Sequence, residues 1–351
     1  MSSAPTYPDT RFNRACRCLE VDRPPVWIMR QAGRYLPLYQ QLRAQYSFIE
    51  ICKKPEMAAK ATLDAANYLD TDAAIIFSDI MIPAIGMGLD LDFNPGPILA
   101  QPVRTANDVA SLKVVEPETD LPYVLEAIRQ TRTSLPQHKS LIGFVGAPLT
   151  MCGYLIEGGP NKNWTHFKEM LYGNSPLFEK LIESVTESIT RHAAAQVAAG
   201  CDAIQLFDSN AGQVAPRELH EFGFKFAQKA ITALKGLGVP IIYFARDIGP
   251  HFEAASELGA DVLGVDWSIS LSEVHRRVRK DIALMGNLDP GILFTSTAEV
   301  EKRVQAILDE AQNIPGFIFN LGHGILPKTP PENAVALVKT VQNYRPQMPS
   351  S

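Results

Sequence analysis

Val26-Trp27-Ile28-Met29 is a short run of bulky apolar residues, and a charged residue, Arg30, follows it directly. Such runs, rich in β-branched and aromatic side chains, are typical of strands buried on both faces. Seven further runs of this kind occur along the chain: Ala73-Ala74-Ile75-Ile76-Phe77, Leu141 to Val145, Ala203 to Phe207, Ile241 to Phe244, Val262 to Val265, Ile282 to Met285 and Phe317 to Phe319. The sequence therefore predicts eight buried strands.

Segments with a helical period separate these runs, for example Leu177 to Ala199 and Ser270 to Arg279. Strands that alternate with helices pair in parallel through crossover connections. Eight such units predict one closed (β/α)8 TIM barrel, for which 351 residues is an ordinary length when the loops carry insertions. Because no repeat or long linker divides the chain, residues 1–351 are expected to form a single barrel domain with short N-terminal and C-terminal extensions.

Local signals add detail to this frame. Thr329-Pro330-Pro331-Glu332 has the pattern of a capping box before a helix from Ala334 to Tyr344, and Ser296 to Glu299 and Ser270 to Glu273 repeat it. The Pro- and Gly-rich stretch Pro83 to Pro102 is expected to be a long barrel loop.

Composition excludes several classes of protein. A net charge of -5 with both signs mixed along the chain argues against a general nucleic-acid or membrane-surface binder. Five scattered cysteines fit reduced thiols in a cytosol-like compartment, and no apolar stretch is long enough to span a bilayer or act as a signal core in Met1 to Glu20. The chain also lacks the common zinc, dinucleotide and phosphate-loop patterns, so nothing calls for a metal or nucleotide.

Polar residues follow each predicted strand. They are Arg30, Asp79, Gly146-Ala147-Pro148, Asp208-Ser209, Arg246-Asp247, Asp266, Asn287, Asn320 and His323. In a barrel these positions lie on the C-terminal rim, where barrel enzymes build their active sites. The alternative is that strand ends are polar simply because the chain turns there, and it accounts for part of this set.

Met29 to Tyr35 carries two arginines, Arg30 and Arg34, with Gly33 between them and Pro37 expected to end any helix early. The segment should be a shaped loop. Arg43, in a predicted helix from Leu38 to Tyr46, is placed to point back toward it. Guanidinium groups bind carboxylates through two parallel hydrogen bonds, so this cluster suits a ligand with several carboxylates. The alternative is a set of surface arginines paired with Asp or Glu.

Four other residues are candidates for the site. Asp79 ends an otherwise apolar run, where a carboxylate is costly to bury unless donors or a cation meet it, although it could instead cap the next helix. Tyr154 could donate to a ligand acid or be a core tyrosine, and Ser209 suits a hydrogen-bond donor or a turn serine. His323 lies between two glycines, which let the backbone approach a ligand closely; acid, carboxylate binder and plain loop histidine all stay open.

The stretch from Pro25 to Pro37 resembles the N-terminal signature of uroporphyrinogen decarboxylases. Further blocks match in family order: Phe77-Ser78-Asp79-Ile80, Gly146-Ala147-Pro148-Leu149-Thr150, Ile156-Glu157-Gly158-Gly159, Gln205-Leu206-Phe207-Asp208-Ser209, Gly286-Asn287-Leu288-Asp289-Pro290 and Asn320-Leu321-Gly322-His323-Gly324-Ile325. The chain departs from the family at Leu38, Asn210, Met151-Cys152-Gly153 and Ala245-Arg246-Asp247, where a glycine-containing turn is usual. None of these departures falls on an expected ligand contact.

The resemblance implies a cofactor-free barrel enzyme, usually a homodimer, in the cytoplasm or in a plastid stroma. Such an enzyme converts the four acetate arms of uroporphyrinogen III to methyl groups, giving coproporphyrinogen III and CO2 in haem and chlorophyll biosynthesis. It implies Asp79 and Arg30 as catalytic residues. The implied substrate-binding residues are Arg30, Gln31, Ala32, Gly33, Arg34, Arg43, Asp79, Tyr154, Phe207, Ser209 and His323.

This chemistry needs no cofactor, because protonation of the pyrrole ring creates a cation that accepts the electrons left by CO2. Asp79 suits stabilisation of that cation. The proton donor stays open: an arginine with a pKa above ~12 is a poor acid, whereas His323 is closer to the required pKa. Arg30 is therefore expected to position the reacting carboxylate.

Two alternatives belong to other classes of protein. A methyltransferase on the same barrel would need thiolate and histidine ligands for zinc near the last strands, and this chain has no cysteine after Cys201. A non-catalytic porphyrin-binding protein would be expected to lose Asp79 or the arginines, and this chain keeps them.

Overall fold

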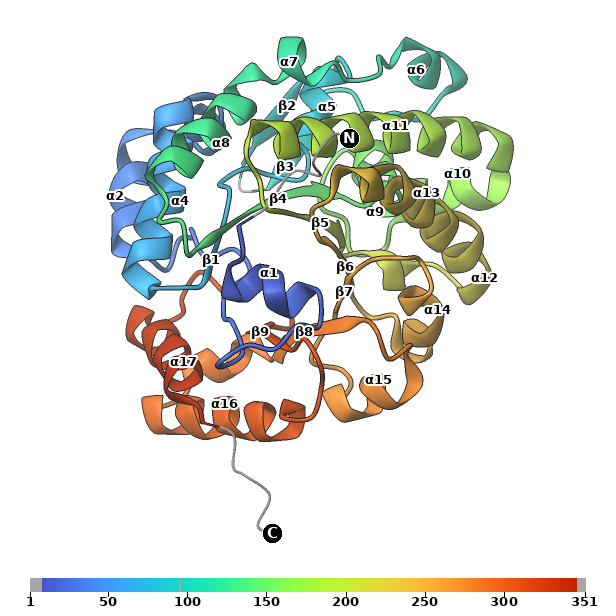
Figure 1. Cartoon of the computed structure of the whole chain (residues 1–351). Helices are drawn as coiled ribbons and strands as arrows, with labels where there is room; N and C mark the ends of the chain where they lie inside the picture. The colour runs from blue at the N-terminus through green and yellow to red at the C-terminus, as the bar shows by residue number, and fades with distance from the viewer. Residues whose placement is uncertain (1–7, 95, 346–351) are drawn as a thin grey trace, which may run out of the picture.

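A parallel sheet forms the centre of the computed structural model, which describes residues 8–94 and 96–345 (Figure 1). Its seven strands are hydrogen-bonded in the order β1-β4-β5-β6-β7-β8-β9. They are β1 (Ala73–Ile75), β4 (Ser140–Gly146), β5 (Ala203–Asp208), β6 (Ile241–Ala245), β7 (Val262–Gly264), β8 (Ala283–Leu288) and β9 (Ile318–Leu321). Each coincides with a predicted strand to within a few residues, and the prediction of an α/β barrel is confirmed.

The eighth predicted strand, Val26 to Met29, forms only a single parallel bridge, from Val26 to Phe319 of β9. Its backbone nevertheless closes the ring. Phe319 N–H donates to Pro25 O at 2.9 Å on one side, and Asp72 N–H donates to Val26 O at 2.8 Å on the other, just before β1. Beyond Trp27 the strand prediction is wrong, because the N–H of Met29 bonds to the Asn320 side chain at 2.9 Å instead of to a neighbouring strand.

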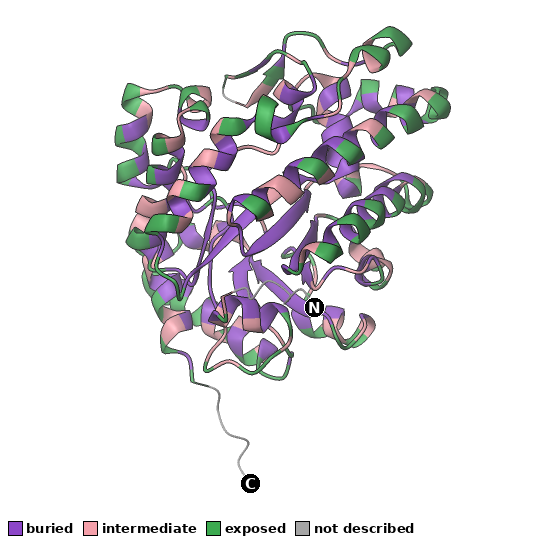
Figure 2. Ribbon diagram, turned by 45° about the horizontal axis from the view of Figure 1, so that its top comes forward, coloured by how far each residue is buried: buried purple, intermediate pink, exposed green. Residues whose placement is uncertain are grey.

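Eight principal helices surround the sheet, one after each strand position. They are α4 (Pro55–Leu69), α8 (Pro122–Ser134), α11 (Ser175–Ala199), α13 (Lys225–Leu234), α14 (Phe252–Ser256), α15 (Leu271–Arg277), α16 (Thr297–Ala311) and α17 (Pro331–Asn343). The helix ring also closes, since α17 packs against both α16 and α4. Figure 2 shows buried strands inside helices whose outer faces are exposed. No helix in the described part of the chain is long and apolar enough to cross a membrane.

The barrel interior is closed at its N-terminal end by α1 (Arg11–Cys16), which lies across the centre of the view in Figure 1. Phe12, Ala15 and Cys16 of this helix share one core with the inward-facing strand residues, such as Ile142 and Ile242. Because this end is filled by side chains, a ligand has access to the barrel only from the C-terminal rim.

Insertions on that rim follow the first strand positions. They comprise α2 (Pro37–Gln45), α3 (Phe48–Lys53), α5 (Ile82–Gly86), the antiparallel hairpin β2 (Leu91–Phe93) and β3 (Pro97–Leu99), α6 (Ala106–Ser111), α7 (Pro117–Asp120), α9 (Pro148–Glu157) and α10 (Thr165–Gly173). The stretch from Pro83 to Pro102, predicted as a long barrel loop, lies in the connection between β1 and α8 and holds part of α5 and the hairpin. Its residue 95, like residues 1–7 and 346–351 of the predicted extensions, lies outside the described residues.

Two of the three predicted helix caps are present. The hydroxyls of Ser296 and Ser270 accept hydrogen bonds from the N–H groups three residues on. The capping box at Thr329 is wrong: α17 begins at Pro331, so Pro330 occupies the cap position, and within the described residues the Thr329 hydroxyl has no hydrogen-bond partner. Pro37, expected to end a helix, instead begins α2, where a missing N–H costs nothing.

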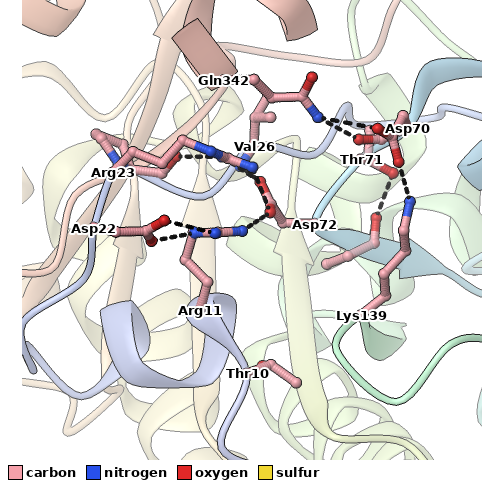
Figure 3. Close-up of polar contacts among 12 residues, drawn as sticks. Thr10, Arg11, Asp22, Arg23, Val26, Asp70, Thr71, Asp72, Lys139 and Gln342 are labelled. Atoms are coloured by element: carbon pink, nitrogen blue, oxygen red, sulfur yellow. Dashed lines mark hydrogen bonds and ion pairs between the residues drawn. The ribbon is translucent and has the colours of Figure 1, made fainter. Parts of the chain in front are cut away.

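A buried ion-pair network fastens the closure at the N-terminal end of the barrel (Figure 3). The carboxylate of Asp72 accepts from Arg11 at 2.6 Å, from both terminal nitrogens of Arg23 at 2.8 and 2.9 Å, and from the N–H of Val26 at 2.8 Å. Asp22 in turn binds Arg11 from the solvent side. This end of the barrel holds the fold together, which leaves the other end for function.

Candidate active site

The predicted site residues lie on successive elements around the C-terminal rim, the mouth of the barrel. Arg30 follows the closing segment, Asp79 follows β1, and Tyr154 lies in α9 after β4. Ser209 follows β5, and His323 follows β9. The chain thus brings residues from five positions of the ring to one face, as parallel strands require.

Arg30 adopts a left-handed backbone conformation with φ of 63°, which is uncommon for a residue other than glycine and is found at functional sites. Its side chain runs over Gly324, where a Cβ atom would lie only 2.3 Å from Arg30 Cδ. Gly322 is covered in the same way by Trp267. The glycines beside His323 therefore make room for Arg30 and Trp267, whereas the sequence had suggested close approach to a ligand.

The arginine cluster is largely free of internal partners. Within residues 8–94 and 96–345, the guanidinium groups of Arg30 and Arg34 form no hydrogen bond or ion pair, and Arg43 donates only to Tyr46 O, at 2.6 Å. Arg43 and Arg34 both lie near the phenol of Tyr39: burial raises its pKa to about 12, and their positive charges partly oppose that rise. The alternative of arginines paired with surface carboxylates does not describe this cluster.

Asp79 is partly buried at the start of α5. Its Oδ1 accepts from Met81 N–H at 2.9 Å, so the carboxylate does cap the next turn, as one alternative had it. Burial raises the pKa of Asp79, and the Met81 hydrogen bond and the charge of Arg30 partly offset that rise. Oδ2 has no hydrogen bond in the described part of the chain, so this oxygen remains available to a ligand.

Aromatic rings form the floor of the mouth. Phe207 packs edge-on against Phe144 at 5.6 Å and Phe244 at 6.1 Å between ring centroids. In α9, Tyr154 packs against Trp164 with ring centroids 5.5 Å apart. Sequence reasoning named Phe207 and Tyr154 but missed Phe144 and Phe244, although both occupy inward positions that the strand alternation identifies.

A buried hydroxyl network fixes the loop that carries Ser209. Asp208 accepts from Thr150 Oγ1 at 2.6 Å and from Tyr243 OH at 2.8 Å, and Asn210 N–H donates to Thr150 Oγ1 at 3.1 Å. Both neighbours of Ser209 are therefore anchored. Burial raises the pKa of Asp208, so its role is to hold the loop.

His323 contacts the floor through Phe244, with ring centroids 6.1 Å apart. Burial, and then the charges of Arg30 and Arg246, lower its pKa to about 3. Nδ1 accepts from Gly324 N–H at 2.7 Å, which places the hydrogen of the neutral ring on Nε2. The expectation that His323 has a pKa suited to a general acid is wrong for this environment, because two arginines disfavour its charged form.

The pH dependence of stability should reveal this neutral histidine. Between its folded pKa of about 3 and its ordinary value of 6.5, the unfolded chain binds a proton that the folded protein does not. The free energy of unfolding should therefore fall as the pH drops through this window. His323→Gln is expected to flatten the dependence by up to about 1.4 kcal/mol per pH unit, measured by urea unfolding at pH 7, 6 and 5. Equal slopes in the two proteins would contradict the assignment.

The remaining predicted site residues differ in their exposure to solvent. Ala32 and Gly33 are partly exposed in the loop after Arg30. Gln31 is completely buried, and its Nε2 lacks a hydrogen-bond partner within the described residues; its predicted contact with substrate is untested. Among the described residues, no three His, Cys, Asp or Glu side chains come together in a way that could hold a metal ion.

Comparison with known proteins identifies relatives over the full barrel. The family model for uroporphyrinogen decarboxylase (URO-D) matches residues 7–344. Proteins named uroporphyrinogen decarboxylase from Geobacter sp. (strain M21) and Geobacter sulfurreducens are 43% identical over 333 residues, which cover 95% of this chain and 98% of each relative. The one from Trichlorobacter lovleyi is 44% identical with the same coverage.

Solved structures agree on the fold. A methyltransferase from Methanosarcina mazei has a TM-score of 0.82 at 20% identity, covering 96% of this chain and 99% of its own. A B12-independent methionine synthase from Shewanella has a TM-score of 0.54 at 14% identity, covering 82% and 87%. At such low identity these likenesses show the architecture alone. On the strength of the family model and the close relatives, the chain belongs to the uroporphyrinogen decarboxylase family.

Proposed function

We propose that the protein decarboxylates the four acetate arms of uroporphyrinogen III to methyl groups, giving coproporphyrinogen III and CO2 in porphyrin biosynthesis. Membership of the family supports this activity. The observation that carries it is the pairing of a partly buried carboxylate, Asp79, with arginines that have no acid partner among the residues the structure describes. No observation of comparable weight favours the methyltransferase alternative.

Charge supports the choice of substrate class. Uroporphyrinogen carries eight carboxylates, whereas the protein has a net charge of -5, so local cations must overcome a general repulsion. Arg30 and Arg34 are exposed at the mouth, and their guanidinium N–H donors are unused within residues 8–94 and 96–345. Each offers a planar donor pair that fits one carboxylate.

Asp79 supplies the electrostatic part of the proposed mechanism. Burial raises the pKa of Asp79 and so favours its protonated form. Four pyrrole N–H donors and the cation formed by ring protonation would each favour the ionised form instead. The carboxylate then stabilises positive charge where it develops, in a site whose donors and walls are already in place.

The charged donor Arg30 and the neutral donor His323 have separate tasks in this scheme. Arg30 holds the acetate that loses CO2, because it lies close enough to Asp79 to affect its titration. His323, neutral at pH 7, donates through Nε2–H to a second carboxylate and does not act as an imidazolium acid. Ser209 and Tyr154 provide further hydroxyl donors to the acid arms.

Anaerobic incubation of the purified protein with uroporphyrinogen III tests the proposal directly. The products are oxidised and the porphyrins separated by chromatography. Porphyrins with seven, six, five and then four carboxyl groups should appear in turn, without added metal or cofactor. Unchanged uroporphyrin after incubation with folded protein would refute the activity.

Arg34→Ala should raise KM for uroporphyrinogen by about tenfold and change kcat much less, because the lost hydrogen bonds serve binding both before and during the reaction. Steady-state kinetics at fixed ionic strength measure the split. Arg217→Ala is the matched control, because Arg217 is 83% exposed and is not one of the predicted site residues. An Arg34→Ala enzyme with unchanged KM would rule out the role as a carboxylate clamp.

We also propose a homodimer that pairs these mouths, in a reducing compartment such as the cytoplasm. Large apolar side chains are exposed on rim segments, among them Leu38, Trp267 and Leu326, at 38%, 44% and 39%. Grouped exposed apolar residues commonly mark an interface. All five cysteines are free thiols, which suits a reducing environment. Sedimentation analysis would contradict the dimer if it found only monomer at micromolar concentration.

A further inference from the structure

Arg246 directly follows β6, at the C-terminal rim of the barrel. It follows Phe244 by two residues, and alternate residues of a strand share a face. Phe244 belongs to the interior core, while Tyr243 and Ala245 belong to the outer one. Phe244 also contacts the ring of His323. The side chain of Arg246 is therefore expected to lie above Phe244 and beside His323, facing the site.

Within the described residues, the guanidinium of Arg246 is hydrogen-bonded through its Nε edge only. Nε donates to Asp247 Oδ2 at 2.8 Å, and Asp247 has a left-handed backbone, with φ of 59°. The N–H of Asp247 is anchored in turn on Oδ2 of the buried Asp266 at 2.6 Å. Nη1 and Nη2 of Arg246 have no partner within the described residues, and the side chain is 27% exposed. The loop thus presents two pairs of unused donors in a fixed orientation.

Arg246 lies opposite the arginine cluster. Starting from the closing segment that precedes Arg30, β6 is the fourth strand position in either direction: β1, β4, β5, β6 one way and β9, β8, β7, β6 the other. Arg30 and Arg246 both lower the pKa of His323, so both charges act on the mouth. The mouth therefore carries cations on two facing sides.

We infer that Arg246 is a carboxylate-binding residue that holds an acid arm of the tetrapyrrole on the side remote from Arg30. The inference rests on the proposed function. A macrocycle with acid arms on every ring presents carboxylates in all directions, and Arg30, Arg34 and Arg43 can meet them on one side only. Asp247 orients the guanidinium, so that its two terminal nitrogens meet a carboxylate in the bidentate geometry that arginine favours.

Substitution of Arg246 tests the inference through kinetics. Arg246→Met keeps the apolar stem and removes the charge, and it should raise KM for uroporphyrinogen by about tenfold to a hundredfold with kcat within about threefold. Arg246→Lys keeps the charge without the fork and should restore part of the loss. Arg217→Met is the matched control and should leave both constants unchanged. Melting temperatures confirm that each variant is folded.

A second measurement does not depend on turnover. Because Arg246 lowers the pKa of His323, Arg246→Met should raise it, and NMR titration of the imidazole reports the change. If the wild-type protein fails to convert uroporphyrinogen, the proposed function fails, and this titration alone then shows whether Arg246 faces the site. If the wild type is active, an unchanged KM in folded Arg246→Met overturns the inference, as does a titration that does not move.

Discussion

Asp79→Asn is expected to lower kcat by about a hundredfold or more, by analogy with the loss of one preorganised electrostatic partner at a transition state. The substitution keeps the shape of the side chain and the acceptor for Met81 N–H, so α5 should still start correctly. It removes the negative charge that faces the protonated pyrrole. Because that positive charge exists only during the reaction, kcat should fall much more than the affinity for substrate.

Single-turnover kinetics under anaerobic conditions separate the chemical step from product release. Asp90→Asn is the matched control: Asp90 lies in the same rim insertion, is exposed, and uses no side-chain hydrogen bond in the described part of the chain. It should turn over normally. Asp79→Asn with near-normal turnover would remove Asp79 from its proposed role and leave the arginines as the main electrostatic feature of the site.

The strand positions of this protein could be predicted from sequence, because each strand is buried on both faces. A run such as Ala203 to Phe207 is apolar for a reason that does not depend on the rest of the chain, and β5 is found there. Closure of the ring could not be predicted in this way. It depends on Asp72 and Asn320, whose side chains take backbone N–H groups of a segment far away in sequence.

The site, like the fold, could be predicted from the sequence only in part. Order along the strands placed the candidate residues on one rim, and the structure places Arg30 close enough to affect the pKa of both Asp79 and His323. The protonation state of His323 was not predictable, because it is set by burial and by two arginines that lie 293 and 77 positions earlier in the sequence. Arg246 was visible only as one polar strand end among several. Its distinction is geometric: it lies opposite Arg30.

Substitutions at the N-terminal end of the barrel should lower the stability of the protein and leave its activity largely unchanged. Asp72→Ala is expected to lower the free energy of unfolding by about 3 to 5 kcal/mol, the cost of removing one partner from a buried ion pair. Asp72 is 7% exposed and Arg23 is 11% exposed, so the guanidinium left behind could not regain water without disturbing the segment that closes the barrel. The N–H of Val26 would also lose its acceptor.

Urea unfolding at neutral pH measures the loss, and Asp22→Ala is the matched control. Asp22 also binds Arg11, but it is 69% exposed, so its removal should cost about 1 kcal/mol or less. KM and kcat of folded Asp72→Ala should stay near wild type, because Asp72 precedes β1 at the N-terminal end of the barrel whereas Asp79 follows β1 at the other end. Equal losses of stability in the two variants would mean that burial of Asp72 does not matter, and that backbone hydrogen bonds alone close the ring.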